Sequence, residues 1–275
     1  MTWWAIDVRP DPSRRDWIGA WLVARTGQAV EERDDGTLVT FAEDERAAEA
    51  LVAALAAAED APVESSRRPL EPVDWTTRWR DGLGPRTFGR LTVVPSWIAC
   101  PPGQGPTVVL DPESAFGSGE HGSTRAALTL LERHLRPGDR VLDLGSGSGI
   151  LAIAAAKLGA AVAVGIENDP EANPVARRNA ERNGVAGIEF LDGDAGDLAP
   201  LLGPADLLLS NILRTVNTAL LPAIVSALRP GGLAVFSGME TTEAAAFRPV
   251  LAAAGLIERD EVADTGWWAV AAARP

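Results

Sequence analysis

The residues with the clearest chemical potential form one continuous stretch, residues 141–151, which reads VLDLGSGSGIL. Its apolar start predicts a short buried strand that carries one acid, Asp143. Glycines at alternate positions, Gly145, Gly147 and Gly149, then predict a tight turn, and the run ILAIAAAKL that follows predicts a helix. Glycine lets the backbone pass close beneath a ligand, and a helix N-terminus offers it free N–H groups. The stretch therefore predicts a cradle for a nucleotide-type ligand.

The spacing of the glycines indicates which nucleotide this is. A dinucleotide site reads GxGxxG, but residue 150 is Ile, so the third glycine is misplaced for that ligand. The GxGxG form with Asp143 ahead of it resembles the first motif of S-adenosylmethionine-dependent methyltransferases. A ribose-binding acid is expected about 20 residues further on, at the end of the next strand. Glu167 follows the apolar run 161–166 and meets that expectation.

Length and composition restrict the number of domains, the class of protein and the kinds of site. A chain of 275 residues predicts two domains, and 46% hydrophobic content with a mean hydropathy of +0.03 predicts a globular, soluble protein. No apolar run reaches the ~18 residues of a membrane span, and no signal peptide is evident, so a cytoplasmic location is expected. A single cysteine and two histidines argue against a disulfide and against a metal site. The net charge of −13 argues against non-specific nucleic-acid binding. It favours a basic partner, although solubility alone explains it equally well.

Residues 1–70 predict a small α+β domain. Strand, helix, two strands around a hairpin turn at Asp34-Asp35-Gly36, helix and strand follow in the order of a ferredoxin-like fold. On the first helix, Trp17, Trp21 and Ala24 share one face and are expected to point inward. This part of the chain has no catalytic constellation. Its acids could face a basic partner, or they are simply solvated.

The remainder is expected to be a linker over residues 71–106 and a catalytic domain over residues 107–275. Trp75 and Trp79 predict a short helix in the linker. Beyond residue 107, strands alternate with helices, which predicts a parallel sheet with its ligand at the carboxyl ends of the strands. The residues at such ends are Gly145, Glu167, Asp194 and Asn211. Thr124 is expected at the start of a helix, where its hydroxyl can cap that helix or reach a ligand carboxylate.

Several motifs along the chain resemble one family closely, the ribosomal protein L-eleven methyltransferases. They are DPxxAFGxGxHxxT over residues 111–124, DLGSGSGILAIAAAKLGA over residues 143–160, NAERNG over residues 179–184, and Asn211-Ile212-Leu213. The segments DWxxxW at 74–79, FGRL at 88–91 and PSW at 95–97 are similar too. The resemblance covers nearly the whole chain.

The resemblance implies a Rossmann-like, seven-stranded class I methyltransferase domain preceded by a small ferredoxin-like α+β domain that docks the substrate. It implies that S-adenosylmethionine is the methyl donor. The acceptors would be lysine and N-terminal amino groups of a basic large-subunit ribosomal protein, with no direct nucleic-acid or membrane partner. By position, the S-adenosylmethionine contacts would be Thr124, Gly145, Gly147, Glu167 and Asn211. Asn211 would also be the catalytic residue, accepting from the amine or holding the cofactor.

The chain departs from the family in the loop and at the ribose-binding acid. The loop usually reads GTGTHPTT, but here it reads GSGEHGST, with Glu120 in place of a threonine and Gly122 in place of a proline. Glu167 stands where an aspartate is usual. Glu120 would put a negative charge near the cofactor carboxylate, or offer one to an incoming lysine.

Phe116 can line the methyl channel and attract a methylated ammonium, or simply pack. Two alternatives remain open for the function. One is a methyltransferase of a different protein lysine, and the other is a degenerate enzyme that binds cofactor and acts as a scaffold.

Overall fold

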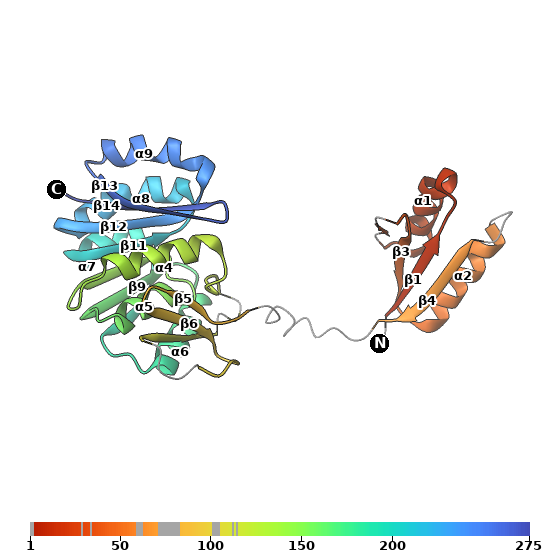
Figure 1. The fold of residues 1–275 in the computed structure, drawn as a ribbon, viewed down its shortest axis with the longest axis horizontal. Coiled ribbons are helices and arrows are strands. Elements are labelled where there is room, and N and C mark those ends of the chain that lie inside the picture. The colour runs from red at the N-terminus through yellow and green to blue at the C-terminus, as the bar shows by residue number, and fades with distance from the viewer. Residues whose placement is uncertain are drawn as a thin grey trace. The chain divides into compact units, whose positions relative to one another are not determined.

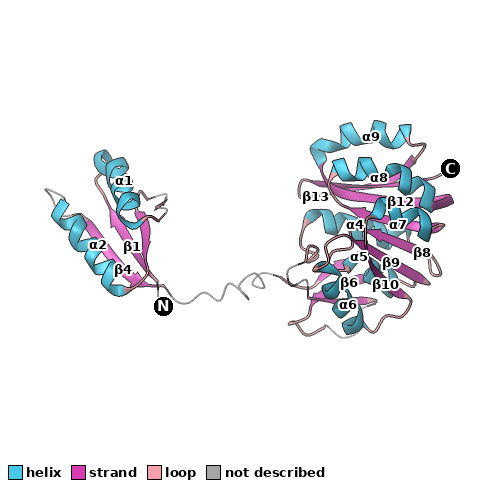
Figure 2. Ribbon diagram, turned by 180° about the vertical axis from the view of Figure 1, so that it is seen from behind, coloured by secondary structure: helices cyan, strands magenta, loops and turns pink. Residues whose placement is uncertain are grey.

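The structure is a computed structural model that describes residues 3–28, 30–33, 35–58, 63–70, 83–100, 105–111, 113 and 115–275. The chain divides into two compact units, Met1–Gly82 and Leu83–Pro275. Figures 1 and 2 show the elements of both units.

Unit 1 is a four-stranded sheet in the order β2-β3-β1-β4 with two helices. The element bounds are β1 Trp4–Arg9, a 3-10 turn Pro12–Arg14, α1 Arg15–Thr26, β2 Glu31–Glu32, β3 Leu38–Ala42, α2 Glu45–Ala58 and β4 Glu64–Pro69. β1 pairs antiparallel with both β3 and β4, as the ferredoxin-like order requires. Asp44 caps α2, since its Oδ1 accepts from Ala47 N at 2.7 Å. The predicted ferredoxin-like domain is therefore confirmed.

The inward face of α1 differs from the expectation. Ile18 and Leu22 are fully buried in the core of unit 1, whereas Trp17 is 46% exposed and Ala24 lies at the surface. The guanidinium of Arg14 lies 5.1 Å from the ring centre of Trp17. Two adjacent stripes of this helix have apolar residues at helical spacing. Ile18 and Leu22 occupy the core, Trp21 is half-buried and packs against it, and Trp17 is exposed.

Unit 2 is built on a seven-stranded sheet in the order β10-β9-β8-β11-β12-β14-β13. The bounds of these strands are β8 Arg140–Leu144, β9 Val162–Glu167, β10 Ile188–Asp192, β11 Ala205–Asn211, β12 Leu228–Glu240, β13 Ile257–Asp264 and β14 Trp267–Ala273. β10, β9, β8, β11 and β12 pair in parallel, and β14 runs antiparallel to β12 and β13. This is the expected methyltransferase sheet.

Helices cover both faces of this sheet (Figures 1 and 2). Their bounds are α4 Gly122–His134, α5 Ile150–Lys157, α6 Ala172–Asn183, α7 Ala195–Leu202, α8 Arg214–Ala227 and α9 Ala244–Ala253. α4, α5 and α6 pack on one face, and α7, α8 and α9 pack on the other. Alternate residues of β11 enter the two cores, with Leu207 and Leu209 on one side and Leu208 on the other. A strand buried on both faces needs such a continuous apolar run.

Unit 2 also contains a second, three-stranded sheet. Because of this sheet, unit 2 begins earlier in the chain than the expected boundary at residue 107. Its strands are β5 Arg86–Phe88, β6 Leu91–Pro95 and β7 Thr107–Leu110. The sequence reading assigned residues 71–106 to a linker, but the described residues from Leu83 onward lie within unit 2. Phe88, Leu91 and Val93 are buried against the α4–α6 face of the large sheet. The predicted helix around Trp75 and Trp79 lies outside the described residues.

Two asparagines of the NAERNG motif attach α6 to this small sheet. Asn183 Oδ1 accepts from Val109 N at 2.8 Å and its Nδ2 donates to Val109 O at 2.7 Å. Asn179 makes the equivalent pair with the backbone of Asp111, at 3.0 and 2.9 Å. Each side-chain amide completes both hydrogen bonds of a backbone unit at the edge of β7, so these bonds fix Val109 and Asp111 against α6.

In the part of the chain that the structure describes, no helix combines the length and apolarity needed to cross a membrane.

Candidate active site

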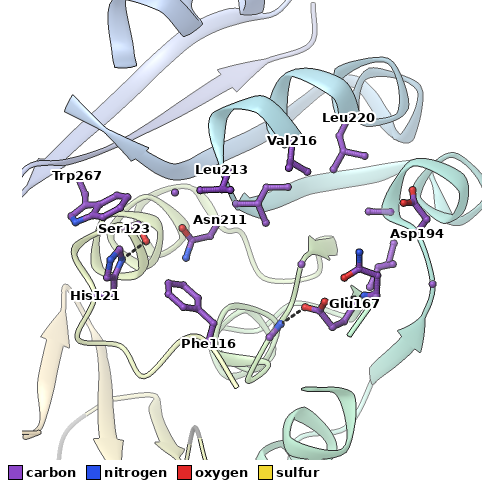
Figure 3. Close-up of a pocket in the computed structure, with 18 residues that line it drawn as sticks. Phe116, His121, Ser123, Glu167, Asp194, Asn211, Leu213, Val216, Leu220 and Trp267 are labelled. Carbon is purple, nitrogen blue, oxygen red and sulfur yellow. Dashed lines mark hydrogen bonds between the residues drawn. The ribbon is translucent and has the colours of Figure 1, made fainter. Parts of the chain in front are cut away.

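A cavity of about 540 Å³ lies in unit 2 at the carboxyl ends of β8, β9 and β11. Four of the predicted site residues, Gly145, Gly147, Glu167 and Asn211, line it together. The other lining residues include an aromatic and polar group (Phe116, His121, Ser123, Asp194, Trp267) and an apolar group (Ile166, Ile212, Leu213, Val216, Leu220). Figure 3 shows Asn211 between Phe116, His121 and Trp267 on one side and Glu167 and Asp194 on the other.

The glycines of the cradle are required by close packing as well as by backbone conformation. Gly145 has φ +68°, and a Cβ there would lie 2.7 Å from Ile212 Cγ2. Gly147 has φ +50°, and a Cβ there would lie 2.6 Å from the carbonyl oxygen of Phe116. Real Cβ atoms do not approach neighbours this closely, so either substitution displaces a residue that lines the cavity.

Glu167 lies at the end of β9, where the strand register predicted a ribose-binding acid. Its Oε2 accepts from Gly147 N at 2.9 Å, and its Oε1 accepts from Asn168 N at 2.9 Å and Asp169 N at 3.0 Å. A carboxylate has about four lone-pair positions, so at least one is left for the cavity. The same side chain therefore holds the cradle in shape and offers a charged acceptor to a ligand.

The side-chain amide of Asn211 has one hydrogen-bonded atom and one atom without a partner among the described residues. Its Nδ2 donates to Thr124 Oγ1 at 3.3 Å, and its Oδ1 is buried with no hydrogen-bond partner among the described residues. A buried amide oxygen without a donor is costly, on the order of 1–3 kcal/mol, unless a ligand supplies one. Asn211 lines the cavity, and its amide oxygen is an acceptor that has no donor among the described residues.

Thr124 lies beside this group and not in the cavity lining. Its side chain is fully buried in α4, where it is the third residue, and it caps nothing. Its hydroxyl oxygen accepts the hydrogen bond from Asn211 Nδ2. The helix-cap role is wrong, since the N-cap of α4 is His121. The contact of Thr124 with the ligand stays a prediction, and in this structure its hydroxyl orients the amide of Asn211.

Three aromatic rings form the opposite end of the cavity. His121 lies 4.2 Å from Trp267 and 5.4 Å from Phe116, measured between ring centres. Its Nδ1 is 2.8 Å from Ser123 Oγ. Burial, and then the nearby charge of Arg125, lower the pKa of His121. The ring is therefore neutral at neutral pH and adds no positive charge to this end.

Asp143 is a buried acid behind the cradle and does not line the cavity. Its Oδ2 accepts from Ala152 N at 3.1 Å, and its Oδ1 has no partner among the described residues. Burial, with the charge of Glu167 as a smaller contribution, raises the pKa of Asp143 to about 7. We therefore assign it a structural position at the start of α5.

Comparison with known proteins agrees with this geometry. The family model described as "Ribosomal protein L11 methyltransferase (PrmA)" matches residues 19–275. The chain belongs to the ribosomal protein L11 methyltransferase family. It is 42% identical over 208 residues to the ribosomal protein L11 methyltransferase of Thermus thermophilus, covering 76% of this chain and 80% of that protein. The relative from Pelotomaculum thermopropionicum is 43% identical over 232 residues, covering 82% and 74%.

A solved structure shows the same fold. The crystal structure of ribosomal protein L11 methylase from Lactobacillus delbrueckii superposes with a TM-score of 0.64 at 31% identity, covering 70% of this chain and 99% of that one. The chain is accordingly an S-adenosylmethionine-dependent methyltransferase. The cavity fits that cofactor in its chemistry, since it offers a carboxylate to ribose hydroxyls, an unsatisfied amide oxygen to an ammonium or amine, and an apolar wall between them.

Two features of the site were not found from the sequence. Glu120, expected to point at the cofactor or the acceptor, is not among the lining residues and is paired with Arg86. Trp267, to which the sequence reading gave no role, lines the cavity. A signal was present, because Trp267 and Trp268 are neighbours at the start of a strand and must face opposite sides. Trp268 is 3% exposed in the core, which leaves Trp267 for the site.

Proposed function

We propose that this methyltransferase transfers methyl groups from S-adenosylmethionine to lysine and N-terminal amino groups of ribosomal protein L11, a basic protein of the large ribosomal subunit. The observation that carries the proposal is the arrangement of the cavity. A carboxylate end at Glu167 and an aromatic end at His121 and Trp267 meet at the uncommitted oxygen of Asn211 (Figure 3). Such a cavity has room for a nucleoside at one end and for an amine at the other.

The cofactor would be held by the residues of the carboxylate end. The backbone of Gly145 and Gly147 passes beneath it, and Glu167 accepts from the ribose hydroxyls. Of the two roles open to Asn211, contact with the cofactor is preferred to accepting a hydrogen bond from the incoming amine, and Thr124 orients its amide. When bound, S-adenosylmethionine supplies an electrophilic methyl group on a sulfonium. The task left to this chain is therefore to orient a neutral amine toward it.

The aromatic end of the cavity favours the neutral form of the amine over the protonated form. A lysine of pKa about 10.4 is protonated at pH 7, and neutralising it costs roughly 4–5 kcal/mol. Walls formed by Phe116, Trp267 and Leu213 replace water around the ammonium and disfavour its charge. His121 is neutral and does not repel the residual ammonium population. Phe116 can also attract the methylated product through a cation–π contact.

Unit 1 is proposed as the docking module. Residues 1–82 hold 17 acidic and 10 basic residues, a net charge of −7, whereas the longer remainder holds 21 and 15, a net charge of −6. More than half of the net negative charge is thus concentrated in a unit that has no catalytic constellation among its described residues. Such a surface steers a basic protein, and the steering weakens with salt. A cytoplasmic location and the absence of a direct nucleic-acid contact belong to the same proposal.

The scaffold alternative rested on Glu120, and the ion pair with Arg86 removes that support. The test is turnover of S-adenosylmethionine on purified ribosomal protein L11, with mass spectrometry of the product, for the wild-type enzyme and for Asn211→Ala. We expect successive methylation of amino groups by the wild type and about tenfold weaker cofactor binding by the variant, since one hydrogen bond to a charged group is worth roughly 1.5–3 kcal/mol.

Three outcomes would contradict parts of this proposal. Cofactor binding without any turnover would indicate the scaffold. Turnover on other lysine-containing proteins but not on ribosomal protein L11 would indicate a different substrate. Unchanged cofactor affinity and turnover in Asn211→Ala would remove Asn211 from the site.

A further inference from the structure

The loop of residues 115–121 carries two walls of the aromatic end, Phe116 and His121, and it is held from outside the cavity by an ion pair. Glu120 lies between these two residues but does not line the cavity. Its carboxylate is bidentate with Arg86 of β5: Arg86 Nε lies 3.1 and 3.2 Å from its two oxygens, and a terminal guanidinium nitrogen lies 2.6 Å from Oε2. Hydrogen bonding to Glu120 and its charge raise the pKa of Arg86.

A second arginine holds the main chain at the same residue. Arg125, in the first turn of α4, donates to the carbonyl oxygen of Glu120. The same guanidinium binds both carboxylate oxygens of Asp264, at 2.6 and 3.0 Å, and Thr265 Oγ1 at 2.8 Å. Glu120 is thus fixed at its side chain by Arg86 and at its backbone by Arg125.

The far end of this network lies next to the third aromatic wall. Asp264 ends β13 and Trp267 begins β14, so the two flank one short turn. Gly122 packs against the same turn, since a Cβ on it would lie 2.6 Å from Trp267 Cδ1 and 2.8 Å from the carbonyl oxygen of Asp264. Glu120 and Gly122, two of the departures in the loop, therefore serve one arrangement. One supplies the charged anchor, and the other leaves space for the indole ring.

The chain offers a matched ion pair that does not touch the loop. Arg90 and Glu132 also join the small sheet to α4, at 3.0 Å, with side chains 50% and 17% exposed. The corresponding values for Arg86 and Glu120 are 49% and 22%. Exposed pairs of this kind contribute little to stability, about 0–1 kcal/mol. If stability were the whole role of the Arg86–Glu120 pair, breaking either pair would have the same consequence.

We propose that Arg86 and Glu120 are positioning residues for methyl transfer, holding Phe116 and His121 against Trp267 at the acceptor end of the cavity. This proposal rests on the proposed function, in which the amine to be methylated binds at the aromatic end of the cavity. The main chain at the start of the loop is bonded separately to the cradle, since the carbonyl oxygen of Phe116 accepts from Ser148 N at 2.9 Å and that of Gly117 from Ser148 Oγ at 2.6 Å. Loss of the Arg86–Glu120 pair removes none of these bonds, so we expect it to affect the transfer step and not cofactor affinity. A small displacement of positioning groups is enough to slow such a step substantially.

The kinetic test uses the full-length enzyme with the variants Glu120→Gln and Arg86→Gln, the charge-exchanged double variant Arg86→Glu with Glu120→Arg, and Arg90→Gln as control. At saturating S-adenosylmethionine we expect kcat for methylation of ribosomal protein L11 to fall about tenfold in the single variants. The dissociation constant of S-adenosylmethionine should change less than twofold. The double variant should recover most of the lost activity, and the control should match the wild type.

A second readout needs no substrate, so it separates failure of this proposal from failure of the proposed function. The chain has only two histidines, so the ring signals of His121 can be followed by NMR with those of His134 as reference. Removing the charge of Glu120 would by itself lower the pKa of His121. Release of the loop hydrates the ring, which raises the pKa of His121, and we expect this effect to outweigh the loss of charge in Glu120→Gln.

A lowered or unchanged pKa of His121 in Glu120→Gln would overturn the proposal, as would equal losses of activity in Glu120→Gln and Arg90→Gln. A parallel loss of cofactor affinity and kcat would overturn it too. If the wild type methylates nothing while the His121 titration behaves as expected, the proposed function fails and the positioning of the loop stands.

Discussion

Replacing Glu167 by glutamine tests the carboxylate end of the cavity most directly. The substitution keeps the size of the side chain, removes its charge and turns one acceptor oxygen into a donor. In the structure both oxygens face backbone donors, Gly147 N on one side and Asn168 N and Asp169 N on the other. Whichever way the amide turns, its NH₂ group faces at least one N–H group.

The expected magnitude follows from these contacts. Three backbone donors already occupy about four acceptor positions of the carboxylate, so the ribose would gain the remaining one. Each hydrogen bond to a charged group is worth roughly 1.5–3 kcal/mol. Loss of one such bond predicts a decrease in S-adenosylmethionine affinity of about ten- to hundredfold. Glu167→Asp keeps the charge and should lose less than about tenfold.

The assay is isothermal titration calorimetry with S-adenosylmethionine, accompanied by thermal denaturation to verify the fold of each variant. Glu171→Gln is the matched control, because it removes the same charge from an exposed side chain four positions further along the chain. An affinity for Glu167→Gln within twofold of the control would refute the placement of the ribose at this carboxylate.

Three further predictions concern the cradle, the buried acid and unit 1. Gly145→Val should abolish cofactor binding, because its Cβ would lie 2.7 Å from Ile212 Cγ2, and unchanged calorimetric affinity in a folded variant would contradict this. The pKa of Asp143 is raised from 3.8 to about 7, so between these pH values the unfolded chain loses the proton first and stability falls as pH rises. Asp143→Asn should therefore stabilise the protein at pH 8, by about 4 kcal/mol at most, and far less at pH 4; equal denaturation midpoints for variant and wild type at pH 8 would disprove the charge penalty. Residues 71–275 alone should keep cofactor affinity but lose most methylation of intact ribosomal protein L11, while a free peptide with a target lysine is affected far less; methylation at the full-length rate would exclude a docking role for unit 1.

Local sequence was sufficient to predict the cradle and the order of the elements. The glycines after β8 and Glu167 at the end of β9 belong to neighbouring parallel strands, whose carboxyl ends must meet at one edge of the sheet. The apolar run of β11 likewise predicts a central strand, and its last residue, Asn211, then reaches the same edge. These features depend on periodicity and strand register, which a short window of sequence contains.

The partners of these residues depended on tertiary structure. The sequence could not show that Thr124 orients Asn211, because the two are brought together by packing of α4 on the sheet from positions 87 residues apart. The partner of Glu120 is Arg86, 34 residues earlier in a strand that the sequence reading placed in a linker. The face of α1 that is buried was also undetermined, since two adjacent stripes had suitable apolar residues and only packing against β3 selected Ile18 and Leu22. Sequence patterns determine which residues share a face or an end of an element. The three-dimensional packing of those elements determines what each side chain contacts.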